Sequence, residues 1–62
     1  MTYYCRIDYR VGNIGGLSVV GRGAKYPENA YYDAIDKISI LYRRFDVITI
    51  TMFDSNGRSW RF

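Results

Sequence analysis

Residues 27–45 carry the strongest pattern in this chain of 62 residues. Apolar side chains recur there at intervals of three and four residues, which is the spacing of a helix with one buried face. Pro27 suits the first turn of a helix, where the N–H that it lacks would have no partner. The pattern therefore predicts a single helix over 27–45. Its core-facing stripe is made of Tyr31, Ala34, Ile35, Ile38, Leu41, Tyr42 and Phe45.

Charged residues in this segment are ordered from acidic to basic. Glu28 stands near the start, and Arg43 and Arg44 stand near the end. This order opposes the helix dipole and so stabilises the helix. The face opposite the stripe holds two apolar side chains, Tyr32 and Ile40, among charged ones. Scattered exposed apolar residues are common, so these two are either ordinary surface residues or a second contact surface.

The segment before the helix predicts two strands. Residues 2–11 alternate between apolar and polar side chains with a period of two, as in a half-buried strand. Residues 12–16 include three glycines and predict a loop that reverses the chain. Residues 17–22 predict a short second strand, which Gly21 and Gly23 loosen before the helix begins.

The segment after the helix predicts a hairpin with two alternative registers. Residues 46–53 are rich in β-branched side chains and form its first strand. A two-residue turn would pair Phe53 with Trp60, mixing polar and apolar groups on one face. A turn with Gly57 in the left-handed conformation pairs Met52 with Trp60 instead. We prefer this second register and expect Trp60 on the helix side. That face then collects Ile48, Ile50, Met52, Trp60 and Phe62.

Together these elements predict an α+β fold in one compact domain, residues 1–62. The order is ββαββ, with one helix packed on one face of a four-stranded antiparallel sheet whose strand order stays open. A single cysteine excludes an intrachain disulfide, and no apolar run approaches the length of a membrane span. With no secretory signal pattern either, we expect a cytoplasmic protein without membrane contact.

Chemistry-bearing patterns are scarce. The chain has no histidine, the commonest general base and metal ligand. Cys5 lies on the inward side of the first strand, which predicts a core residue. The glycines of 21–25 match no complete phosphate-binding motif, and 54–57 lacks the ligands of a calcium loop. The sequence therefore predicts a protein that is not an enzyme, with no catalytic residues, cofactor or metal.

One helix leaves the other face of the sheet uncovered, and that face is the candidate binding surface. The net charge is +3, and its surplus lies in residues 1–26. Aromatic rings interleaved with arginines suit a protein interface or stacked nucleic-acid bases, although a plain solvated face is an alternative. The predicted contact residues are Tyr4, Arg6, Arg10, Arg22, Phe53 and Arg61, with Val20, Val47, Thr49 and Thr51 between them.

We therefore expect a small non-catalytic protein that occupies a surface of a larger protein or nucleoprotein complex. Its size and build are those that a phage or mobile-element inhibitor of host machinery would have, in which case it would act in the host cytoplasm. The alternative is an RNA- or single-stranded-DNA-binding module that uses the same face. A homodimer closed by this face is a further alternative.

Overall fold

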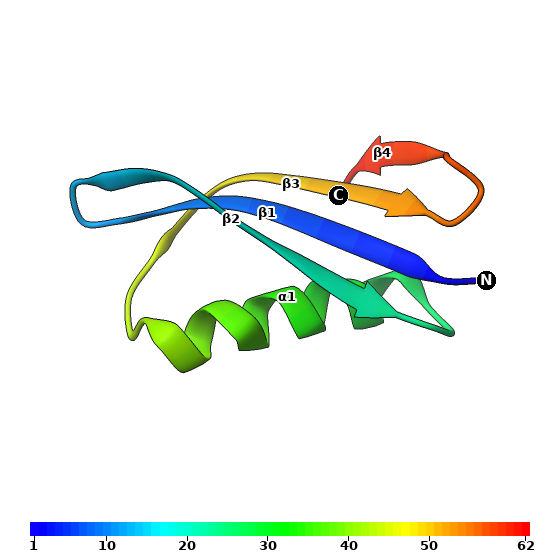
Figure 1. Ribbon diagram of the computed structural model, residues 1–62, viewed down its shortest axis with the longest axis horizontal. Coiled ribbons are helices and arrows are strands. Elements are labelled where there is room, and N and C mark those ends of the chain that lie inside the picture. Colours follow the sequence, from blue (N-terminus) through cyan, green and yellow to red (C-terminus); the bar gives the residue numbers. More distant parts are fainter.

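The computed structural model describes residues 1–62. In chain order the elements are β1 (Tyr3–Val11), β2 (Ile14–Gly23), α1 (Pro27–Leu41), β3 (Asp46–Asp54) and β4 (Ser59–Arg61). The strands form one antiparallel sheet in the order β2-β1-β3-β4. Figure 1 shows α1 lying along one side of the sheet and the β1–β2 hairpin extending past the end of the helix. The predicted ββαββ fold is confirmed.

The helix packs on β2 and β1 rather than on all four strands (Figure 1). The core is consequently small and lies beneath this half of the sheet. Toward the β3 and β4 side, Ile48 remains 62% exposed although it was expected to face the helix, and Phe62 faces the helix as expected but remains 61% exposed. The buried apolar side chains are Cys5, Ile7, Tyr9, Ala30, Ala34, Ile38 and Met52.

Two glycines determine how closely α1 approaches β2. A Cβ atom built on Gly21 would lie 2.2 Å from the carbonyl oxygen of Ala30 and 2.4 Å from the backbone nitrogen of Ala34. One on Gly23 would lie 2.5 Å from the nitrogen of Ala30. The expectation that these glycines loosen the strand is therefore wrong. They are buried within β2, where the missing side chains let the two backbones touch.

The helix ends at Leu41, four residues before the predicted end. Tyr42 has extended backbone angles and caps the helix through its N–H, which donates to the carbonyl oxygen of Ile38 at 2.9 Å. Leaving the helix allows both Tyr42 and Phe45 to contact Tyr9, at ring-centroid distances of 6.1 and 6.2 Å. This early end also corrects two placements. Leu41 is 70% exposed rather than buried, and the following two arginines lie beyond the helix.

The first hairpin turns more tightly than predicted. Gly12 and Asn13 alone form the turn, and β2 begins at Ile14 instead of residue 17. Gly12 has a φ of +57°, the left-handed geometry that the first position of a two-residue hairpin turn requires in type II′. Gly16 has a φ of +73° where the β1–β2 register shifts by one residue. The expected glycine loop is thus a turn followed by a bulge.

The second hairpin has the preferred register. Met52 pairs with Trp60, which places Trp60 on the helix side as predicted. Gly57 has a φ of +86° and donates its N–H to the carbonyl oxygen of Asp54 at 3.1 Å. Beyond β4, the ring of Phe62 stacks on Tyr31 of α1 with centroids 4.9 Å apart. This stack ties the last residue of the chain to the helix.

A bulge in β3 corrects one placement on the open face. Asp8 pairs with Thr49, but Tyr9 pairs with Val47, so Ile48 is an extra residue in β3. The extra residue shifts the alternation of side chains by one position. Val47 consequently lies opposite the core residue Tyr9, on the helix side, and not on the open face where strict alternation placed it.

Side chains from α1 cover part of the outer edge of β2. A carboxylate oxygen of Asp33 accepts the N–H of Arg22 at 2.8 Å, and the ammonium group of Lys37 donates to the carbonyl oxygen of Val20 at 3.0 Å. The two side chains also form a salt bridge of 3.2 Å with each other. They therefore occupy backbone groups that another strand could otherwise use, which protects an edge strand from unwanted pairing.

Replacing Asp33 tests this cover. We expect Asp33→Ala to lower the free energy of unfolding by about 1 kcal/mol, because the N–H of Arg22 loses its acceptor. Asp36→Ala is the matched control, since the side chain of Asp36 makes no hydrogen bond or salt bridge. Urea unfolding followed by circular dichroism measures both. Equal unfolding midpoints for the two variants would show that the Asp33 carboxylate at the edge of β2 does not contribute to the free energy of unfolding.

Candidate interaction surface on the open face of the sheet

Strand register gathers most of the predicted contact residues into two adjacent rows on the face away from α1. In the first row, Tyr4 of β1 lies between Arg22 of β2 and Phe53 of β3. In the second row, Arg6 pairs with Thr51, which in turn pairs with Arg61 of β4. Residues that are separated by up to 57 positions in the sequence therefore share one surface.

The centre of this surface is a pair of stacked rings. Tyr4 and Phe53 have centroids 5.2 Å apart and an interplanar angle of 18°. Both side chains are only partly buried, because no helix covers this side of the sheet. A stacked cross-strand pair is held in place by its own packing. The protein therefore presents a preformed aromatic pair, with little side-chain entropy left to lose on binding.

The arginines around the rings differ in their charge partners. Arg6 donates to Asp8 at 3.2 Å, and Arg10 lies 3.5 Å from Asp46. Arg22 and Arg61 form no salt bridge with any carboxylate of the chain. Free positive charge is therefore concentrated on the two outer strands, on either side of the ring pair, whereas the central arginine is partly neutralised.

Arg10 does not belong to this group. It lies six residues along β1 from Tyr4, which corresponds to about 20 Å in an extended strand. Its side chain faces the same side of the sheet but sits beside Asp46 at the start of β3. Of the six predicted contact residues, the structure brings five together and leaves Arg10 apart.

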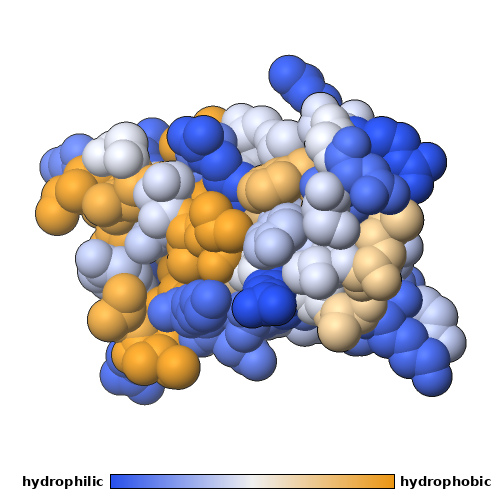
Figure 2. All heavy atoms as spheres, turned by 45° about the vertical axis from the view of Figure 1, so that its right-hand side comes forward, coloured by the Kyte–Doolittle hydropathy of each residue, from blue (hydrophilic) through white to orange (hydrophobic).

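Tyr32 and Ile40, the predicted second contact, are exposed on α1. Tyr32 is 60% exposed and Ile40 is 82% exposed. The helix covers one side of the sheet (Figure 1), and the stacked rings lie on the other side because they alternate along their strands with the core residues Cys5 and Met52. One flat partner surface therefore cannot contact both regions at once. Figure 2 shows a side of the molecule on which apolar groups reach the surface in separate clusters with charged groups between them.

No other part of the chain gathers groups that are typical of a reactive or metal site. Cys5 is fully buried, and burial raises the pKa of its thiol, which favours the unreactive protonated form. No three side chains among histidine, cysteine, aspartate and glutamate lie close enough to hold a metal ion. No helix has the length and apolar character needed to cross a bilayer.

Sequence reasoning did not identify the ion pairs that Asp8 and Asp46 form with Arg6 and Arg10. Alternation along β1 already puts Asp8 on the same face as Arg6, and this signal could have identified that ion pair. The pairing of Arg10 with Asp46 depends on β3 lying next to β1, and no local pattern encodes that neighbour.

Comparison with known proteins adds no relative, since no family model, curated protein or solved structure matches the chain.

Proposed function

We propose that this protein is a small non-catalytic binding protein whose open sheet face occupies a surface of a larger protein or nucleoprotein complex. The observation that carries the proposal is the half-buried, solvent-facing ring pair of Tyr4 and Phe53, flanked by the unpaired cations Arg22 and Arg61. Rigid aromatic residues and arginines dominate the binding energy of protein interfaces. A protein that masks a partner's surface in this way would act as an inhibitor of that partner.

Ring geometry favours a protein partner over a nucleic acid. A base needs a free ring face on which to stack, and each ring of the pair already uses one face on the other. The carboxylate of Asp8 also lies beside Arg6 on this surface, where it would repel phosphates. Both features suit a protein partner with mixed polar and acidic groups better than a uniformly anionic strand.

Charge reversal of Arg22 and Arg61 tests the proposal. The tagged protein and its variants would be incubated with a lysate of the source cells, and the retained proteins would be quantified by mass spectrometry. We expect a partner retained by the wild type to be lost, by about tenfold or more, with Arg22→Glu/Arg61→Glu and with Tyr4→Ser. The control is Arg43→Glu/Arg44→Glu, which makes the same change in charge elsewhere and should retain that partner.

Two outcomes would replace the proposal. Micromolar binding of generic single-stranded RNA or duplex DNA that weakens steeply with salt, measured by fluorescence polarisation, would favour the nucleic-acid module instead. Light scattering that shows a dimer, together with a monomer for Tyr4→Ser, would mean that a second copy covers the open face. If the open-face variants retain the same proteins as the wild type, this face is not the binding surface.

A further inference from the structure

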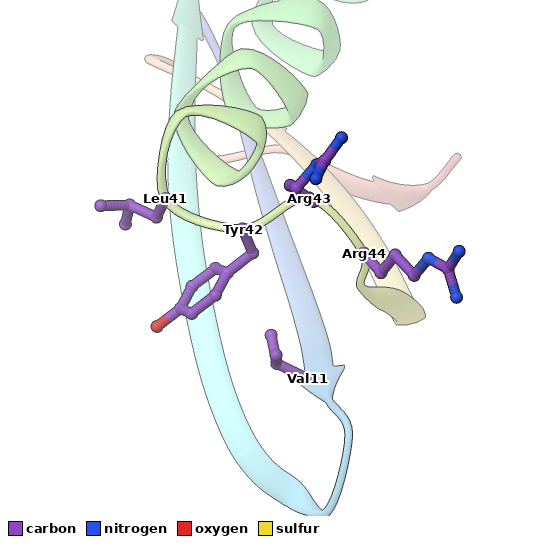
Figure 3. A pocket seen from close by; sticks show the side chains of 5 residues that line it. All are labelled: Val11, Leu41, Tyr42, Arg43 and Arg44. Carbon is purple, nitrogen blue, oxygen red and sulfur yellow. The ribbon is translucent and has the colours of Figure 1, made fainter.

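A second surface lies at the opposite end of the molecule from the ring pair, where the helix stops short of the projecting hairpin. A hollow of about 780 Å³ opens between the end of α1 and the end of β1. Its volume is in the range of ligand-binding sites. Five residues line the hollow, and they are Val11, Leu41, Tyr42, Arg43 and Arg44 (Figure 3).

Two aromatic anchors hold the arginines of this hollow in place. Tyr42 and Phe45 both pack against Tyr9, so the chain between them is fixed at each end. Arg43 and Arg44 fall between the anchors and are directed outward, as Figure 3 shows. Neither forms a salt bridge with a carboxylate of the chain. The early end of the helix therefore presents two adjacent cations on a short, anchored segment.

Apolar and charged groups occupy different sides of the hollow. Leu41 and Tyr42 extend on one side, with the Tyr42 side chain between Leu41 and Val11 of the hairpin, whereas the guanidinium groups of Arg43 and Arg44 point away from them and from each other (Figure 3). Leu41 is 70% exposed, so it offers apolar surface that the fold does not use. A ligand that used the whole hollow would combine an apolar group with more than one anionic group.

We propose that this hollow binds an acidic peptide segment in which an apolar side chain is flanked by carboxylates. The apolar side chain would pack on the Tyr42 ring between Leu41 and Val11, and separate carboxylates would pair with Arg43 and Arg44. The two guanidinium groups point apart, so a single phosphate would be poorly placed to pair with both of them. A peptide suits the spacing because neighbouring side chains diverge in the same way. This site is independent of the open sheet face.

Local charges support an anionic ligand. Asp46 is the nearest carboxylate along the chain, lining a second hollow together with the two arginines, and it is already paired with Arg10 at 3.5 Å. The last turn of α1 contains no basic side chain, so Arg43 and Arg44 alone offset the partial negative charge of the C-terminal carbonyl groups of the helix. Arg43 and Arg44 are therefore the cations that meet a ligand at this end of the helix, and the residues lining the first hollow include no acid.

The test uses a fluorescein-labelled peptide with a central leucine flanked on each side by glutamates, and fluorescence polarisation at low salt. We expect the wild type to bind this peptide and to bind its glutamine counterpart at least about tenfold more weakly. Arg43→Glu/Arg44→Glu, and the milder Arg43→Gln/Arg44→Gln, should each weaken binding by about tenfold or more. Leu41→Ser should weaken it by a smaller factor. Circular dichroism checks that each variant is folded.

Arg22→Glu/Arg61→Glu is the matched control, because it changes the net charge equally but lies on the open face. Unchanged peptide binding by this variant would support the proposal that the peptide binds in the hollow. An equal loss with both pairs of substitutions would show attraction to net charge alone and would overturn the proposal. So would absence of binding at low salt, or equal binding of the glutamine peptide. The lysate experiment tests the effect of substitutions at Arg22 and Arg61, whereas the peptide experiment tests substitutions at Arg43 and Arg44. Failure of either proposal therefore leaves the other intact.

Discussion

Replacing Gly21 with alanine is expected to unfold a large fraction of the protein. The new Cβ atom would lie 2.2 Å from the carbonyl oxygen of Ala30 and 2.4 Å from the nitrogen of Ala34. Both atoms belong to the helix backbone, so no side-chain rotation relieves the clash, and α1 would have to move away from β2 by about 1 Å. We expect a loss of more than about 3 kcal/mol. A domain of this size has roughly 3–9 kcal/mol in total.

The matched control is Gly15→Ala in the same strand. Nothing lies within 4 Å of a Cβ atom at Gly15, and its φ is not positive. Its replacement should change the free energy of unfolding by less than about 1 kcal/mol, and the reduced freedom of the unfolded chain favours a small gain. Thermal unfolding followed by circular dichroism compares the two variants. A wild-type midpoint for Gly21→Ala would contradict the close helix–strand contact.

Removing the charge of Asp54 is expected to have the second largest effect, and this effect should depend on pH. Asp54 is 4% exposed. One carboxylate oxygen accepts the N–H groups of Asn56 at 2.9 Å and Arg58 at 3.1 Å, and the other accepts from the Arg58 guanidinium at 3.1 Å. Asp54→Asn would turn an amide donor toward that guanidinium. We expect the thermal midpoint at neutral pH to fall by several degrees.

The pKa of Asp54 gives the direction of the pH dependence. Burial acts to raise the pKa, but the hydrogen bonds from Arg58 and Asn56 and the charge of Arg58 outweigh it, so the pKa lies below its usual value. Hydrogen bonds from the Arg22 N–H and from Lys37 lower the pKa of Asp33 as well. The folded state therefore binds protons less readily than the unfolded chain. The stability that these two carboxylates contribute is fully present above their unfolded pKa of about 4 and is lost as the pH falls through their lower folded values.

Midpoints measured between neutral and strongly acidic pH would check this expectation. The wild type should lose stability below about pH 4. Asp54→Asn should start from a lower midpoint and lose less, so that the two curves converge in acid. Asp36→Asn serves as the control, because its carboxylate has no bonding partner in the structure. Parallel curves for the wild type and Asp54→Asn would show that the carboxylate of Asp54 does not contribute through its charge.

The two proposed surfaces divide the arginines of the protein between different ends of the molecule. Arg22 and Arg61 flank the aromatic pair on the open face, whereas Arg43 and Arg44 border the hollow beyond the helix. Both pairs lack carboxylate partners.

Local sequence patterns determined the fold class, the faces of β1 and the register of the second hairpin. The period-two alternation of residues 2–11 places Cys5 in the core and Tyr4 on the open face, because side chains alternate in any strand. The register of Met52 with Trp60 follows from collecting apolar side chains on one face and from the left-handed conformation of Gly57. These features depend on neighbours within a few residues, so they can be derived without knowledge of the rest of the fold.

Tertiary contacts alone decided the strand order, the end of the helix and the place of the β3 bulge. Apolar periodicity continues to Phe45, yet the helix stops at Leu41 because Tyr42 and Phe45 both pack against Tyr9, a contact between segments far apart in the sequence. From the sequence, Gly21 is expected only to loosen its strand. The close contact with the backbone of α1, which requires a glycine at this position, is visible only in the folded protein. Apolar patterning identifies which side of an element is buried, whereas the partner that buries it depends on distant segments, which only the assembled fold brings together.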